Sequence, residues 1–174
     1  PNLNPELKSI GNLDFIQLEI EEELITKLSK LSFFQGVFES EGDKLIALNI
    51  SPEFKLHDNF IFGSKFKGKT NERFTQMMIN VGLASVDKKE KVKILDPMCG
   101  RATTLLWGMR YGLNAKGVEL DPRATADINQ IVKKWSKVCE ISSKVKEGFI
   151  LIKSVESTLI SISVFMLWLL YSLS

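Results

Sequence analysis

Residues 93–122 read KILDPMCGRATTLLWGMRYGLNAKGVELDP, and this stretch decides the fold of the chain. Two short apolar runs have the length of buried strands, and the first of them ends at Asp96. The segment between them has helical spacing and stops at Gly112, a residue typical of helix C-termini. Asp121 and Pro122 form a helix start, with aspartate as the cap and proline at the first helical position. Strands that alternate with helices in this order predict a doubly wound α/β sheet with neighbouring parallel strands.

The ends of the two predicted strands carry residues suited to a nucleotide cofactor. Ligands bind at the carboxyl ends of parallel strands, and Asp96 is placed at such an end. The turn after it must bring backbone N–H groups close to the ligand, so a side chain at Gly100 would obstruct that approach. Glu119 follows at about the 20-residue spacing at which an acidic side chain accepts both ribose hydroxyls. Leu120 would then flank the adenine ring, while Asp121 caps its helix.

The order Asp-Pro-x-Cys-Gly favours S-adenosylmethionine (SAM) over a dinucleotide as the ligand. SAM carries a sulfonium cation and an amino group, so the carboxylate of Asp96 near the methionine part is electrostatically favourable. Each residue also has a structural alternative. Asp96 could cap a helix, Glu119 could be a solvated strand end, and Cys99 could be an inert buried thiol. The cofactor hypothesis rests on all of them standing in register with both strands.

Three segments resemble class I SAM-dependent methyltransferases related to the tRNA guanine-N2 methyltransferases and the bacterial large-subunit rRNA methyltransferase K/L. Residues 96–103 resemble their Asp-Pro-x-Cys-Gly-x-Gly-Thr motif, and residues 117–122 resemble their ribose-binding motif. Residues 63–76 resemble the segment that precedes the sheet and lies across the methionine end of the cofactor. The resemblance covers about residues 60 to 138. It implies a Rossmann-like SAM-dependent methyltransferase fold, SAM as the cofactor, and an amino group of nucleic acid, RNA rather than DNA, as the methyl acceptor.

The resemblance also implies a set of site residues, although Ala102 stands where the motif has its second glycine. The residues expected to contact the cofactor are Asp96, Pro97, Cys99, Gly100, Ala102, Thr103, Glu119, Leu120 and Asp121, with Thr70 and Asn71 as further candidates. The candidates for contact with RNA phosphate are Lys65, Lys67 and Lys69, with Phe66 as a platform for a stacked base. A solvated loop is the alternative interpretation of this lysine segment.

Composition limits the remaining possibilities. The chain has 174 residues, 44% hydrophobic and 25% charged, which is typical of a soluble globular protein. A net charge of +2 provides no global field for nucleic-acid binding, so any basic patch must be local. Cys99 and Cys139 are too few for a disulfide framework or a zinc site, so we expect no metal and a reducing, cytoplasmic setting. His57 has no recognisable nucleophile partner and is expected at the surface.

The pattern along the chain predicts three parts. Residues 1–62 form a small α+β extension, with a strand-helix-strand unit between residues 13 and 50. Residues 63–138 form the cofactor-binding domain with a partial parallel sheet. Its helices should bury two apolar stripes, one of Phe74, Met77, Met78 and Val81, the other of Ile128, Ile131, Val132 and Trp135. Trp107 is expected in the core as well. Residues 139–174 form an atypical apolar tail, since no proline follows Pro122 and no charged residue follows residue 156.

This tail lacks a feature that catalysis requires. Methylation of an exocyclic amine needs acceptors that hold the nitrogen so that its lone pair points at the methyl group. The related enzymes use a later Asp/Asn-Pro-Pro-Tyr or Asp-x-Pro-Tyr motif, and no proline is available for it here. Catalysis by this chain alone is therefore not expected. Either a protein partner completes the site, or the chain is a non-catalytic SAM-binding module.

Three interpretations of the tail remain open. It could be a truncated or frame-shifted end. Residues 149–152 and 160–170 could be further strands or a helix of a shortened sheet. Residues 157–174 could be a membrane anchor at the lower length limit for a span, which would make the chain a membrane-tethered protein.

Overall fold

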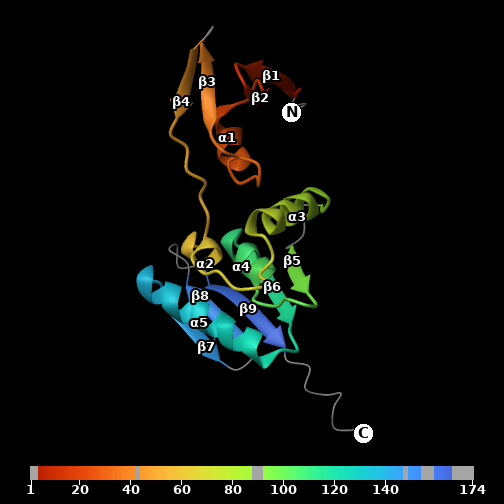
Figure 1. Cartoon of the computed structure of the whole chain (residues 1–174), viewed down its shortest axis with the longest axis vertical. Helices are drawn as coiled ribbons and strands as arrows, with labels where there is room; N and C mark the ends of the chain where they lie inside the picture. Colours follow the sequence, from red (N-terminus) through yellow and green to blue (C-terminus); the bar gives the residue numbers. More distant parts are fainter. Residues whose placement is uncertain (1–3, 42–43, 88–91, 147–148, 154–158, 166–174) are drawn as a thin grey trace. The chain divides into compact units, whose positions relative to one another are not determined.

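The computed structural model describes residues 4–41, 44–87, 92–146, 149–153 and 159–165 (Figure 1). Side chains are described up to residue 143. Contacts within the chain divide it into two compact units, Pro1–Glu53 and Phe54–Ser174. The division lies earlier than the predicted boundary at residue 62. Residues 54–62 belong to the second unit because their helix packs on helices of that unit.

The first unit consists of two hairpins and a helix. Its elements are β1 (Glu6–Ile10), β2 (Leu13–Gln17), α1 (Glu22–Leu28), β3 (Val37–Glu41) and β4 (Lys44–Leu48). β1 pairs with β2 and β3 with β4, both antiparallel. The sequence predicted β2, α1 and β4, but it missed β1 and β3. Gly11, with φ +62°, forms the tight turn between β1 and β2, and this Gly-Asn turn was the available signal for the first hairpin.

The second unit is a five-stranded sheet with helices. Its elements are α2 (Asn59–Phe62), α3 (Glu72–Ala84), β5 (Lys93–Asp96), α4 (Thr103–Arg110), β6 (Asn114–Val118), α5 (Pro122–Val138), β7 (Ser143–Lys146), β8 (Phe149–Lys153) and β9 (Leu159–Phe165). The strand order is β5-β6-β9-β8-β7. β5, β6 and β9 are parallel, whereas β8 is antiparallel to both of its neighbours. The α/β class and the parallel β5–β6 pair are as predicted, but the sheet as a whole is mixed, and the described strands do not form the predicted doubly wound, Rossmann-like sheet.

Small residues allow α4 to lie close against the sheet, and α5 lies on the same face (Figure 1). A Cβ added at Gly108 of α4 would lie 3.0 Å from Ile94 and 3.3 Å from Ala115. A Cβ added at Gly117 of β6 would lie 2.6 Å from Leu105. Residues of α2, α4, α5 and the sheet form the core, which includes Trp107, Ile128, Ile131 and Val132 as predicted, while Trp135 is partly buried against it.

The prediction for α3 was wrong in its orientation. Phe74, Met77, Met78 and Val81 are between 44% and 61% exposed. The opposite face, with Thr75, Gln76 and Ile79, is buried, and α3 packs against α4. This burial is possible because the buried amide of Gln76 is bonded, donating to the Tyr111 hydroxyl at 3.3 Å and accepting from Arg73 at 3.0 Å.

The residues after 138 continue the sheet. β8 and β9 coincide with two of the apolar segments of the tail, in agreement with the interpretation that they are further strands. Residues 166–174 lie outside the described part of the chain, as do residues 157 and 158 of the anchor hypothesis. Within the described residues, no helix is long and apolar enough to cross a membrane.

Candidate functional site

Two chain segments meet at the carboxyl ends of β5 and β6. The backbone N–H of Cys99 donates to the carbonyl of Val118 at 3.0 Å, which joins the glycine turn to the end of β6. The turn closes on itself, because the N–H of Ala102 donates to the carbonyl of Cys99 at 2.7 Å. Asp96 accepts from the N–H of Met98 at 3.1 Å through one oxygen, so its carboxylate orients the start of the turn. The predicted cofactor residues of both motifs thus form one edge.

Glu119 connects the two segments through its carboxylate. One oxygen accepts the N–H of Gly100 at 2.7 Å, and the other accepts the N–H groups of Leu120 and Asp121, each at 2.8 Å. A carboxylate offers about four acceptor positions, and three are occupied here. Acceptance of two ribose hydroxyls therefore requires the release of one backbone bond. We expect the bond to Gly100 to open, because it joins two separate segments. The bonds to Leu120 and Asp121, which shape the turn directly after Glu119, can then remain.

The turn has space on its outer side. Gly100 has φ +51°, and a Cβ added there would meet no heavy atom within 4 Å. Ala102 also adopts the left-handed conformation, with φ 62° and ψ 28°. This conformation explains why glycine suits the position in the motif. Since Ala102 is 0% exposed, its methyl group lies inside the core and occupies no solvent-facing space that a cofactor would need.

Cys99 lies in the turn as a buried, neutral thiol. Burial raises its pKa from 9.0 to about 11, and the negative charges of Asp96 and Glu119 contribute to the same direction. A thiolate, not a thiol, is the nucleophile in cysteine chemistry. Cys99 therefore does not supply a covalent nucleophile at neutral pH, in agreement with the interpretation of an inert thiol.

We expect the two cysteines to differ in their reaction with iodoacetamide. At neutral pH the partly exposed Cys139 should be alkylated first, with Cys99 protected by burial and by its raised pKa. Between pH 9.0 and about 11 the thiol of the unfolded chain is ionised while the folded one keeps its proton. The unfolded state then binds fewer protons, so stability falls as the pH rises through this window. Site-resolved mass spectrometry measures the alkylation rate of each cysteine. Faster alkylation of Cys99 than of Cys139 would contradict the assignment of Cys99 as a buried, neutral thiol.

Comparison with known proteins adds no assignment to this geometry. No family model, curated protein or solved structure matches this chain.

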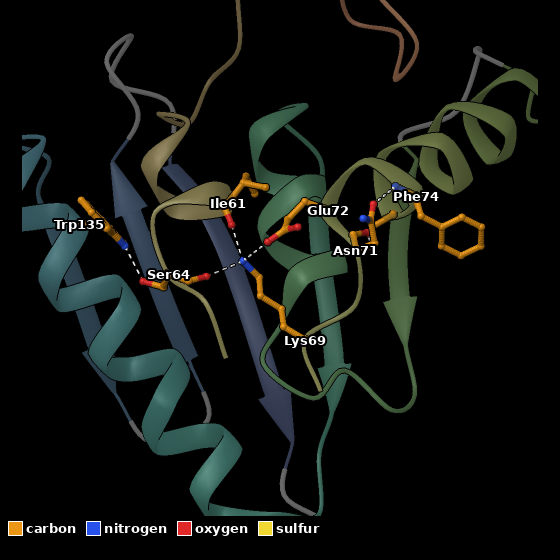
Figure 2. Close-up of polar contacts among 8 residues, drawn as sticks. Ile61, Ser64, Lys69, Asn71, Glu72, Phe74 and Trp135 are labelled. Atoms are coloured by element: carbon orange, nitrogen blue, oxygen red, sulfur yellow. Dashed lines mark hydrogen bonds and ion pairs between the residues drawn. The ribbon is translucent and has the colours of Figure 1, made fainter. Parts of the chain in front are cut away.

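Other predicted site residues have mainly structural positions. Asp121 caps α5 by accepting the N–H of Arg123 at 2.9 Å, and Asn71 caps α3 by accepting that of Phe74 at 2.9 Å (Figure 2). Thr103 is buried at the start of α4. The remaining candidates are exposed: Thr70, Pro97 and Leu120. Of these, Leu120 follows directly after Glu119 and offers an apolar surface beside the turn.

Lys69 differs from the other two lysines of its loop. Its ammonium donates to the carbonyls of Ile61 and Ser64 and lies 2.8 Å from a carboxylate oxygen of Glu72 (Figure 2). Burial raises the pKa of Glu72, but the hydrogen bond from Lys69 and nearby positive charge lower it more, so the net shift is downward. The side chain of Lys69 is 5% exposed. Its placement in an RNA contact is corrected accordingly, because the ammonium is bound to the protein itself.

Sequence reasoning missed Arg101, which links three segments. Its Nε lies 2.7 Å from a carboxylate oxygen of Asp127, and a terminal nitrogen donates to the carbonyl of Lys67 at 3.1 Å. Its guanidinium lies 5.3 Å from the ring centroid of Phe66. The ring is thus covered by Arg101 and packed against the core, not presented as a free stacking platform. No local signal distinguishes this arginine, since all three partners are distant in sequence.

Proposed function

We propose that the edge formed by the glycine turn and Glu119 binds SAM, and that the chain is the first half of a Rossmann-like methyltransferase domain acting on an amino group of RNA. The observation that carries this proposal is the position of the Glu119 carboxylate beside the glycine turn, at the carboxyl ends of two parallel strands, where one of its oxygens lies 2.7 Å from the backbone nitrogen of Gly100. Ligands of parallel sheets bind at such strand ends.

The residues present fit the cofactor. SAM supplies a methyl group on a sulfonium sulfur. Glu119 would accept the ribose hydroxyls, Asp96 would lie near the positive methionine end, and Leu120 would flank the adenine. Gly100 leaves the approach open. The neutral state of Cys99 supports direct transfer: the lone pair of the acceptor nitrogen attacks the methyl carbon, the carbon–sulfur bond breaks, and the nitrogen loses a proton to solvent or to a base.

A specific observation favours a second candidate, a non-catalytic SAM-binding subunit. β5 is an edge strand of the described sheet, so no described strand on its far side brings side chains to Asp96. Residues 123–174 contain no proline, so the amine-holding motif does not lie within them. Incubation with SAM and bulk tRNA separates the candidates. Methyl transfer supports the enzyme, whereas SAM binding without transfer supports the subunit.

The cofactor proposal predicts that Glu119→Gln weakens SAM binding about tenfold to a hundredfold, as expected when one or two hydrogen bonds to a charged acceptor are lost. Glu6→Gln, an exposed acid in β1, is the matched control and should bind as the wild type does. Isothermal calorimetry measures the affinity, and a melting curve verifies the fold. Absence of binding by the wild type would eliminate the cofactor, and equal binding by Glu119→Gln would eliminate this role of Glu119.

Gly100→Ala provides a second arm of the same test. The added methyl meets no protein atom, so the variant costs about 1 kcal/mol of left-handed strain and blocks the ligand. Gly11→Ala carries the same strain at φ +62° in the β1–β2 hairpin, which contains no candidate cofactor residue, and its added methyl also meets no heavy atom within 4 Å. Gly100→Ala should lose SAM binding, whereas Gly11→Ala should bind SAM as the wild type does.

A further inference from the structure

A groove lies between the loop after α2 and the outer side of α5. It has a volume of about 240 Å³, and its polar lining consists of Ser64, Lys65, Gln130 and Lys134. No carboxylate contributes to this lining. We call it the loop–helix groove.

Positively charged side chains are concentrated around the loop–helix groove. α5 carries four basic residues and one acid, Asp127, while the loop of residues 63–69 carries three lysines and no acid. Asp127 forms an ion pair with Arg101, and Glu72 forms one with Lys69, so both acids are already paired. Among the described residues, neither Lys65 nor Lys134 forms a salt bridge, although the positive charge of Lys65 contributes to the lowered pKa of Glu72. A chain of net charge +2 therefore has a local excess of positive charge here.

Trp135 fixes the two walls of the groove. Its indole N–H donates to the Ser64 hydroxyl at 2.9 Å (Figure 2). Because the hydroxyl oxygen accepts this bond, its own hydrogen remains available to a ligand. The ammonium of Lys134 lies 4.5 Å from the centroid of the Trp135 ring. Two lysines, the Ser64 hydroxyl and the amide of Gln130 thus line the groove, a donor set suited to an anion with several acceptor oxygens.

The groove is connected to the candidate cofactor edge. Arg101, in the glycine turn, bonds the carbonyl of Lys67, two residues after Lys65, and the carboxylate of Asp127, one helical turn before Ile131. A strand of nucleic acid that presents a base at the edge would therefore pass its backbone near the groove. This continuity favours nucleic acid over an anionic membrane as the source of the anion.

We propose that the loop–helix groove binds a backbone phosphate of the nucleic acid strand, with Lys65 and Lys134 as its charged ligands. The proposal rests on the proposed function for the identity of the strand, and it adds α5 to the interface that the sequence placed in the lysine loop alone. It also replaces Lys69, whose ammonium is bound internally, by Lys134.

The test measures binding of the full chain to a labelled single-stranded RNA oligonucleotide over a range of salt concentrations. Each phosphate contact contributes roughly 0.7 to the slope of log affinity against log salt for single strands. The double variant Lys65→Ala/Lys134→Ala should lose about twice that slope and bind more weakly, while Lys65→Arg/Lys134→Arg should retain it. The control Lys93→Ala/Lys116→Ala removes two exposed lysines from β5 and β6 and should leave the slope unchanged.

Each result has one meaning. An unchanged slope in the double alanine variant, or binding to phosphatidylserine vesicles in place of RNA, overturns the groove proposal. SAM affinity is measured on the same variants and should stay at the wild-type value, because both lysines lie outside the cofactor edge. RNA binding that depends on the lysines, without SAM binding, would retain the groove and eliminate the methyltransferase function. SAM binding together with RNA binding that does not depend on the two lysines would eliminate the groove proposal and leave the proposed function in place.

Discussion

Arg110→Ala is expected to lower the free energy of unfolding by about 3 kcal/mol, through loss of a buried charge that connects α4 to the segment before α2. The Arg110 side chain is 7% exposed. Its guanidinium forms an ion pair with Asp58, donates to the carbonyl of Leu56, and lies 3.9 Å from the ring centroid of Phe54. In the variant, the buried Leu56 carbonyl loses this donor and the aromatic ring loses its cation.

The expected loss of stability in Arg110→Ala depends on how deeply the partners of Arg110 are buried. Burial lowers the pKa of Arg110, and the carboxylate of Asp58 offsets part of that effect. Asp58 itself is 63% exposed, so its half of the ion pair is screened by water. The larger contributions are the bond to the Leu56 carbonyl and the contact with Phe54. A guanidinium provides both at once because its donors and its flat face point in different directions.

Asp58→Asn is the matched control for this prediction. It keeps the shape but leaves the buried guanidinium of Arg110 without its counter-ion, so the expected cost is about 1–2 kcal/mol, still below that of Arg110→Ala. Urea unfolding followed by tryptophan fluorescence measures both variants. Equal losses in the two would show that the ion pair, and not the backbone bond with the aromatic contact, carries the stability.

Features with local chemical causes could be predicted from the sequence. The cap at Asp121 with Pro122, the cap at Asn71, and the turn at Gly100 each depend on residues within a few positions of one another. The parallel β5–β6 pair followed from the order of elements. The expected position of Glu119 beside the glycine turn followed from the same order, and the structure places its carboxylate on Gly100.

Features that depend on distant partners could not be predicted. The helical period of α3 shows that two faces exist, but burial of Gln76 depends on Tyr111, far along the chain. Similarly, the three lysines of the loop look alike in sequence. The carbonyls of Ile61 and Ser64 and the carboxylate of Glu72 distinguish Lys69 from its neighbours, and the folded shape of the loop brings them to its ammonium. The hydrogen bonds that polar groups make in the folded chain thus decide which side chains are left for a ligand.

Gly63→Ala is expected to destabilise the protein by about 3 kcal/mol, at the upper end of the range for overpacking. Gly63 ends α2, and a Cβ there would lie 2.3 Å from Cζ2 of Trp135 and 2.5 Å from the carbonyl oxygen of Asn59. The backbone oxygen cannot rotate away. The indole cannot move without stretching its bond to Ser64, so the added methyl forces α2 and α5 apart.

A series of glycine substitutions separates this clash from a general effect of alanine. Gly117→Ala meets a terminal methyl of Leu105 at 2.6 Å, which can rotate, and the Cβ of Cys99 at 2.8 Å, which cannot, so an intermediate cost of about 2 kcal/mol is expected. Gly82→Ala, in α3, meets nothing within 4 Å and should stabilise the helix by roughly 0.5–1 kcal/mol. Urea unfolding should rank the variants Gly82, Gly117, Gly63 in order of decreasing stability. If Gly63→Ala were as stable as Gly82→Ala, the packing of Trp135 against α2, which also forms the wall of the loop–helix groove, would be incorrect.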